Sequence, residues 1–211
     1  MNVLVTGGSR GIGKSIASLF TEKGYNIFAP TRNVLDLTKP IKLQHNRYDI
    51  IINCAGVNPI KPLAGISDDI VMRVNYYSPL EIIQQCIPYM VDNQYGRIIN
   101  IGSIWIDIAK PGRLAYSASK NALHALTKAI TVEYSHLNIL ANTISPGYIG
   151  TDLTYQNNTK EQLALISQNI PIGRLGTPEE IAMLAYQLTI ENTFITGQNI
   201  IIDGGYSCTT Y

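Results

Sequence analysis

Three side chains in the middle of the sequence have the types and the spacing needed to protonate an oxygen atom. Tyr116 and Lys120 are four positions apart, which places both on one face of a helix. A free tyrosine titrates near pH 10. An ammonium ion held one turn away in a poorly hydrated cleft is expected to lower that pKa, so that the phenol can give its proton to a carbonyl oxygen. Ser103 ends the strand pattern RIINIGS, and its hydroxyl would hold the same oxygen and stabilise its charge.

Each of these residues also has an ordinary interpretation. A tyrosine and a lysine at helical spacing usually form a packed, solvated pair, and a serine at the end of a strand usually belongs to a turn. The chemical hypothesis therefore depends on whether the rest of the sequence places these residues beside a ligand site.

A glycine-rich segment near the start of the chain predicts such a site. The segment VTGGSRGIGKS follows a short strand pattern, NVLVT, and precedes apolar residues at helical spacing. Gly7, Gly11 and Gly13 allow a tight turn, a close approach of the backbone to a pyrophosphate and close packing of the helix on the strand. Free N–H groups at the start of the helix attract phosphate. The segment therefore predicts dinucleotide binding.

Strand and helix patterns alternate along the whole chain. Strands that are apolar on both faces and alternate with helices indicate a parallel sheet covered on both sides. We expect a single α/β domain over residues 1–211, a Rossmann-type doubly wound parallel sheet with its ligand at the carboxyl ends of the strands. The expected strands cover residues 2–6, 25–30, 34–37, 49–56, 96–103, 139–147 and 197–205, and the expected helices cover residues 11–24, 67–91 (with Ser67 as N-cap), 115–135, 160–169 and 177–189 (with Thr177 as N-cap).

The segment YNIFAPTRNVLDLT departs from this alternation because two apolar runs lie very close together. About four residues separate Ile27–Ala29 from Val34–Leu37, whereas neighbouring parallel strands need a crossover of about a dozen residues or more. We therefore expect that the helix between the second and third strands is deleted.

The composition excludes several classes of partner. A net charge of +1 over 211 residues gives no electrostatic reason to expect nucleic acid or an anionic membrane. No apolar run reaches the roughly 18 residues of a membrane span. Because a strand pattern begins at Asn2, we expect no leader in front of it. The three cysteines are widely spaced, which favours reduced thiols in a cytoplasmic protein. The three histidines form no cluster, so we expect no metal.

The motifs that carry most information are TGGSRGIG, NCAG at residues 53–56, Asn75, Ser103, YSASK at residues 116–120 and SPGYIGTD at residues 145–152. In this order and spacing they resemble the motif set of the short-chain dehydrogenase/reductase family over nearly the whole chain. IPIGRLGTPEEIA and ITGQNIIIDGG are similar to the beta-ketoacyl-acyl-carrier-protein reductase branch and its near relatives. Two features depart from the family, since Cys54 replaces a usual asparagine and the chain is shorter than most members.

This resemblance implies the roles of the candidate site residues. Ser103, Tyr116 and Lys120 would be catalytic, Lys120 would also hold the nicotinamide ribose, and Asn75 would support a proton relay through water to Lys120. Asp36 and Leu37 match a pair that contacts the adenine ring. The residues expected to bind the dinucleotide are Gly7, Ser9, Arg10, Gly11, Ile12, Gly13, Arg32, Asp36, Leu37, Asn53, Ala55, Gly56, Tyr116, Lys120, Ile149 and Thr151.

The substrate side of the site is expected to combine aromatic side chains with a mobile flap. Ser103, Trp105 and Tyr148 are the candidate substrate contacts, with Tyr155 as a further aromatic residue, although packing or surface roles suit these aromatic residues equally well. Residues 154–171 would form the flap.

The choice of cofactor depends on two arginines. An acidic residue near the end of the second strand would bind the ribose 2′-hydroxyl of NAD, and none is present at residues 30–32. Arg32 and Arg10 would instead bind the 2′-phosphate of NADP. The alternative is that both are solvated surface charges, as most arginines are. We expect NADP(H), with NAD(H) as the alternative.

The sequence as a whole predicts an NADPH-dependent carbonyl reductase. A 3-oxoacyl thioester is the most specific substrate that the resemblance suggests, and a keto-sugar or another small ketone is the alternative. A catalytically idle, NADP-binding regulator or scaffold is the hypothesis from another class. In the family, two long helices pair across two-fold axes, so we expect a homotetramer or a homodimer.

Overall fold

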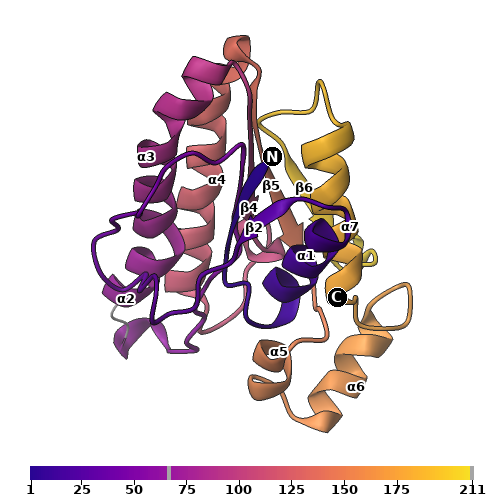
Figure 1. The fold of residues 1–211 in the computed structure, drawn as a ribbon. Coiled ribbons are helices and arrows are strands. Elements are labelled where there is room, and N and C mark those ends of the chain that lie inside the picture. Colours follow the sequence, from indigo (N-terminus) through magenta and orange to yellow (C-terminus); the bar gives the residue numbers. More distant parts are fainter. Residues whose placement is uncertain (66–67, 210–211) are drawn as a thin grey trace.

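A computed structural model describes residues 1–65 and 68–209. These residues contain one sheet of six parallel strands in the order β2-β1-β3-β4-β5-β6, and the expected α/β fold is confirmed (Figure 1). The strands are β1 (Asn2–Thr6), β2 (Asn26–Phe28), β3 (Ile50–Asn53), β4 (Gly96–Ile101), β5 (Ile139–Pro146) and β6 (Asn199–Ile202).

Helices cover both faces of the sheet, as a doubly wound fold requires. One face packs against α1 and α7 through a core that includes Val5, Phe20 and Ile181, and the other packs against α3 and α4 through Ile51 and Ile82. Figure 1 shows α3 and α4 on one side of the strands and α1 and α7 on the other. The helices are α1 (Gly11–Glu22), α2 (Asp69–Met72), α3 (Ser78–Asn93), α4 (Leu114–Tyr134), α5 (Asp152–Gln156), α6 (Lys160–Asn169) and α7 (Pro178–Tyr186).

The sequence signals for helix ends are confirmed at several positions. Thr177 caps α7 and Thr159 caps α6, and each forms a capping box with the residue three positions later. Gly24 follows α1 with φ +84°, a conformation that glycine adopts without steric cost. The expected cap Ser67 lies outside the described residues.

The helix expected over residues 67–91 is interrupted. A π-helical turn, Arg73–Tyr77, lies between α2 and α3 and contains Asn75. Such turns widen the backbone locally and occur often at functional sites. Residue periodicity did not reveal the interruption because apolar positions continue at helical spacing through it.

The strand expected at Val34–Leu37 is wrong. The structure has turns there, and residues 29–49 connect β2 to β3 with no helix and no strand. A link of about four residues cannot carry a chain into a neighbouring parallel strand, so the apolar run packs as a loop instead. The expected absence of the helix is therefore confirmed, and the strand is absent with it. β2 lies at one edge of the sheet.

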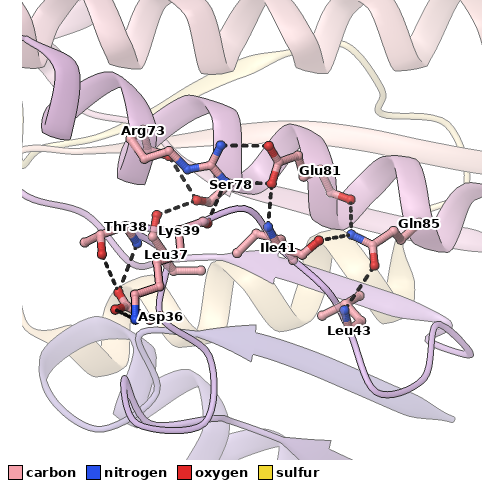
Figure 2. A network of polar contacts seen from close by, with 10 residues as sticks. All are labelled: Asp36, Leu37, Thr38, Lys39, Ile41, Leu43, Arg73, Ser78, Glu81 and Gln85. Carbon is pink, nitrogen blue, oxygen red and sulfur yellow. Dashed lines mark hydrogen bonds and ion pairs between the residues drawn. The ribbon is translucent and has the colours of Figure 1, made fainter.

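Side chains of α3 bind the backbone of this loop in place of a neighbouring strand. Glu81 Oε2 accepts from Ile41 N (2.7 Å), and Gln85 accepts from Leu43 N (3.0 Å) and donates to Ile41 O (3.0 Å). Ser78 Oγ donates to Leu37 O at 2.7 Å. Figure 2 shows these contacts along the loop. They hold the segment against the core that Leu35 and Leu37 help to fill.

Replacing Glu81 by Ala is expected to destabilise the protein. Glu81 also pairs with Arg73 (Nη2 to Oε2, 2.6 Å), so the change leaves the Ile41 amide without its acceptor and the half-buried guanidinium with Lys39 O alone. We expect a loss of about 2 kcal/mol in the free energy of unfolding, measured by urea denaturation. Glu133→Ala, at an exposed position on α4, should change it by less than about 0.5 kcal/mol. Equal losses in the two variants would contradict the bracing role of Glu81.

Candidate active site

A cleft of about 410 Å³ lies where the loops after the strands meet the start of α1 and α4. Ligands of doubly wound sheets bind at this end of the strands. Asn53, Asn75 and Tyr155 do not line the cleft. The expected site residues that line it are Gly7, Ser9, Arg10, Gly11, Ile12, Gly13, Arg32, Asp36, Leu37, Ala55, Gly56, Ser103, Trp105, Tyr116, Lys120, Tyr148, Ile149 and Thr151.

The glycine-rich loop has the bare backbone that a pyrophosphate needs. Gly7 has φ +72°, and a Cβ atom there would lie 2.9 Å from Ala55 Cα. A Cβ atom at Gly13 would lie 2.3 Å from Gly7 O. Arg10 precedes α1 without a side-chain cap, and the first turn contains no acidic residue, so the N–H groups and the positive end of the helix dipole are available to phosphate. The loop therefore fits a dinucleotide.

Two arginines of the cleft come from different loops, Arg10 from the one before α1 and Arg32 from the one after β2. Arg10 and Arg32 are both exposed and line the cleft. Arg32 Nε lies 3.6 Å from Asp36 Oδ1. Hydrogen bonds from Thr38 hold the pKa of Asp36 below its usual value, with a smaller contribution from the charge of Arg32. Arg32 thus lies at the cleft beside an ionised carboxylate.

Asn53 is part of a buried polar layer beneath the cleft. It is 1% exposed, and its Nδ2 donates to Asn100 Oδ1 at 2.9 Å. Asn53 Oδ1 has no hydrogen-bond partner in residues 1–65 and 68–209. Its expected contact with the cofactor stays a prediction, and the structure gives its amide nitrogen a role in joining β3 to β4.

Asn75 holds the loop that follows β3. Its Oδ1 accepts from Val57 N (2.9 Å), and its Nδ2 donates to Val57 O (3.0 Å) and to Ser119 Oγ (2.9 Å). A Cβ atom placed on Gly56 would lie 3.4 Å from Asn75 Oδ1 and 3.5 Å from Lys120 Nζ. Asn75 therefore adjoins the lysine and fixes the backbone beside it.

The structure brings Ser103, Tyr116 and Lys120 together in the cleft. Lys120 is 3% exposed, and its Nζ lies 5.6 Å from the centroid of the Tyr116 ring. Ser103 is 5% exposed, and its Oγ accepts from Trp105 N at 3.4 Å. A hydrogen bond from Ser103 to the Tyr116 side chain favours the phenolate. The three groups expected to be catalytic therefore meet in the cleft that the glycine-rich loop lines.

The expectation that Lys120 lowers the pKa of Tyr116 is wrong for this structure. Burial raises the pKa of Tyr116 to about 12, although Ser103 and the charge of Arg113 oppose it. Burial also lowers the pKa of Lys120 to about 8. The ammonium donates to Ile101 O at 2.6 Å, so it is directed at a carbonyl group and not at the phenol oxygen. Tyr116 therefore carries its proton at neutral pH, as a proton donor must.

The pKa of Lys120 gives an expected pH dependence. Because the folded-state pKa is about 8, the cation is present below pH 8 and is lost as the pH rises. If the cation orients the cofactor, kcat/KM for the dinucleotide should be level below pH 8 and fall about tenfold per unit above it. Lys120→Arg should move the fall to higher pH because a guanidinium stays charged. A wild-type profile that is level to pH 10 would contradict the role of this cation.

Aromatic side chains form the wall opposite the glycine-rich loop. Trp105 and Tyr148 pack edge to face with their centroids 6.1 Å apart, and Tyr206 packs on Tyr148 at 5.3 Å. Lys110 Nζ donates to Tyr148 Oη at 3.0 Å. Tyr155 is 55% exposed. α5 and α6 occupy the segment expected as a flap (Figure 1).

One residue of the cleft was missed in the sequence. Arg113 is 5% exposed and lines the cleft. It lies three positions before Tyr116, so the start of the same helix carries both side chains to the same region. A basic residue one turn before the expected proton donor was the available signal.

Comparisons with known proteins agree with this geometry. A family model described as Enoyl-(Acyl carrier protein) reductase matches residues 30–207. The 3-oxoacyl-(acyl-carrier-protein) reductase FabG of Chlamydia pneumoniae is 31% identical over 237 residues, which cover 96% of this chain and 95% of that protein. The chain belongs to the short-chain dehydrogenase/reductase family. It is therefore an oxidoreductase of a family that binds nicotinamide dinucleotides.

Two solved structures resemble this short-chain dehydrogenase/reductase closely. A 4-hydroxyisoleucine dehydrogenase complexed with NADH has a TM-score of 0.87 and 29% identity, with 99% of each chain covered. A gluconate 5-dehydrogenase from Burkholderia cenocepacia in complex with NADP and tartrate has a TM-score of 0.87 and 25% identity, covering 99% of this chain and 96% of that chain. The two therefore hold different nicotinamide cofactors. Among the described residues, no helix combines the length and the apolar character that crossing a bilayer requires.

Proposed function

We propose that the chain is an NADPH-dependent carbonyl reductase in which Tyr116 is the proton donor. The observation that carries this proposal is that Ser103, Tyr116 and Lys120 line the cleft into which the glycine-rich loop opens. The whole described chain then acts as one dinucleotide-binding and catalytic domain. A cleft of about 410 Å³ is within the range of small-molecule sites, roughly 300–1,000 Å³.

Each residue of the set has a distinct task. The bound dinucleotide supplies a hydride to the carbonyl carbon. Tyr116 gives its phenolic proton to the carbonyl oxygen, and Ser103 donates a hydrogen bond to the same oxygen as negative charge develops there. Lys120 holds the nicotinamide ribose through its ammonium group. Asn75 positions the loop beside Lys120 through its bonds to Val57.

NADP(H) is the proposed cofactor, with NAD(H) as the alternative. Arg10 and Arg32 line the cleft at the end where an adenosine ribose would lie. Exposed guanidinium groups suit a 2′-phosphate. Asp36, Leu37, Ile149 and Thr151 also line the cleft and are proposed contacts of the dinucleotide.

The substrate is a ketone, and two classes are supported. Similarity to 3-oxoacyl-(acyl-carrier-protein) reductases favours a 3-oxoacyl thioester. The gluconate 5-dehydrogenase with NADP and tartrate favours a keto-sugar or another small polar ketone. Ser103, Trp105 and Tyr148 would contact either substrate, and residues 154–171 would close over it. We also propose a homotetramer, or failing that a homodimer, as the working form.

The test is oxidation of NADPH in the presence of the two substrate classes. Purified protein should oxidise NADPH with acetoacetyl-N-acetylcysteamine or with members of a panel of keto-sugars and small oxo compounds, and it should use NADPH with at least tenfold higher kcat/KM than NADH. Turnover of one class and not the other identifies the substrate. Tight binding of NADPH without turnover of any carbonyl compound would reject the reductase and favour the idle regulator.

A further inference from the structure

The start of α4 carries a buried cation that the proposed reaction does not use. Arg113 is the N-cap residue of α4 and makes no capping hydrogen bond with its side chain. It is 5% exposed and lines the cleft beside Trp105 and Tyr116. A guanidinium ion stays protonated in proteins, so a full positive charge lies in this part of the cleft.

Two nitrogens of this guanidinium lack partners among the described residues. Arg113 Nε and Nη1 are buried and have no hydrogen-bond partner, and none of the ion pairs found in the described chain includes Arg113. Arg97 is equally buried but has partners: its Nη1 donates to Asn138 O (2.8 Å) and its Nη2 donates to Asn138 Oδ1 (3.2 Å). Burying an unpaired charge is costly. Arg113 therefore has the features of a group whose partner arrives with a ligand.

The surroundings of Arg113 favour an anion. Burial lowers its pKa, and the charged or titratable groups that oppose this shift are the phenols of Tyr148 and Tyr116, with no carboxylate among them. Lys110, which is exposed and does not line the cleft, brings a second cation to the Tyr148 hydroxyl. The positive end of the α4 dipole and the absence of an acidic residue in its first turn act in the same direction.

We propose that Arg113 binds a carboxylate of the substrate and that the preferred substrate is a small oxo acid. This inference rests on the proposed reduction at Tyr116. Arg113 and Tyr116 are three positions apart at the start of α4 and both line the cleft, so a carboxylate bound to Arg113 and a carbonyl oxygen bound to Tyr116 fit within one small molecule. A 2-oxo or 3-oxo acid meets this requirement.

A neutral ester or thioester is a poorer partner for Arg113 than an acid. Such a ligand offers carbonyl acceptors but no negative charge, so the guanidinium would stay uncompensated when the cleft closes. A hydrogen bond to a charged partner contributes about 1.5–3 kcal/mol, which corresponds to about 10- to 150-fold in affinity. The acid should therefore be preferred over its own ester by a margin of this size.

The test compares acetoacetate with methyl acetoacetate, and pyruvate with methyl pyruvate, as substrates with NADPH. Wild type is expected to reduce at least one acid with about 30-fold higher kcat/KM than its ester. Arg113→Gln should lower kcat/KM for that acid about 100-fold and change the value for the ester by less than threefold. Arg47→Gln, an exposed arginine outside the cleft, should change neither. Arg113→Lys should restore part of the preference because it restores the charge.

A binding measurement separates this inference from the proposed reaction. Malonate, titrated calorimetrically into the protein saturated with NADP⁺, should bind at least tenfold more weakly to Arg113→Gln than to wild type, with equal melting temperatures confirming that the variant is folded. Reduction of acid and ester at equal rates, unchanged in Arg113→Gln, would overturn the carboxylate site and leave carbonyl reduction intact. Arg113-dependent binding of malonate without turnover of any ketone would support the anion site and reject the reaction.

Discussion

Replacing Tyr116 by Phe is expected to lower kcat/KM for ketone reduction about 10³-fold, the range of general acid catalysis. The phenol is the proton donor at the centre of the cleft, and its high pKa keeps that proton in place at neutral pH. Removal of one oxygen atom leaves the ring and the packing around it unchanged. The dissociation constant for NADPH, measured by fluorescence titration, should therefore stay within threefold of wild type.

A matched substitution separates the loss of the proton donor from a general effect of removing a tyrosine hydroxyl. Tyr89 lies on α3, outside the cleft, with its hydroxyl 3.5 Å from Asp49 Oδ1. Tyr89→Phe should keep kcat/KM within threefold of wild type. Turnover by Tyr116→Phe at more than a tenth of the wild-type rate would show that another group supplies the proton.

Replacing Arg32 by Ala is expected to reduce the preference for NADPH over NADH about 30-fold. Arg32 lines the cleft at the adenosine end, and a charge-assisted hydrogen bond contributes about 1.5–3 kcal/mol, or about 10- to 150-fold. The loss should appear as a higher KM for NADPH. KM for NADH should change little or fall, because Asp36 loses its nearest arginine and gains freedom to accept from a ribose hydroxyl.

Lys39 provides the matched control for this change. Its Nζ lies 3.8 Å from Asp36 Oδ2, so Lys39→Ala removes a positive charge from the same carboxylate, yet Lys39 does not line the cleft. The ratio of kcat/KM for NADPH and NADH should stay within threefold of wild type. A similar ratio in Arg32→Ala and wild type would reject the arginine as the phosphate contact and leave it as a surface charge.

Local patterns in the sequence predicted most of the fold because they are set by local physics. Apolar residues at helical spacing, a glycine after α1 and a threonine before α7 act within a few residues, and the structure has the expected elements there. The run at residues 34–37 has the composition of a strand but no partner within reach of its short link. Leu37 O accepts from Ser78 of α3, and Glu81 and Gln85 accept from Ile41 N and Leu43 N farther along the same loop (Figure 2). No short-range pattern contains these contacts.

The sequence predicted which residues form the candidate site, but it did not predict how burial and charge shift their pKa values. Ser103 follows a strand and Tyr116 and Lys120 begin a helix, so topology alone brings them to the same end of the sheet. The pKa of Tyr116 depends on how completely the site excludes water and on where the Lys120 ammonium points. Arg113 was missed for a related reason, since burial without a partner is visible only once the chain is folded.

A crystal structure of the protein with NADP⁺ and a bound oxo or hydroxy compound tests the central claim most directly. The account requires the nicotinamide C4 atom to face Tyr116 and Ser103, with the Tyr116 hydroxyl about 3 Å from the ligand oxygen and Lys120 Nζ on the nicotinamide ribose. A nicotinamide ring that turns away from these side chains, or a ligand carbonyl beyond the reach of the Tyr116 hydroxyl, would contradict it.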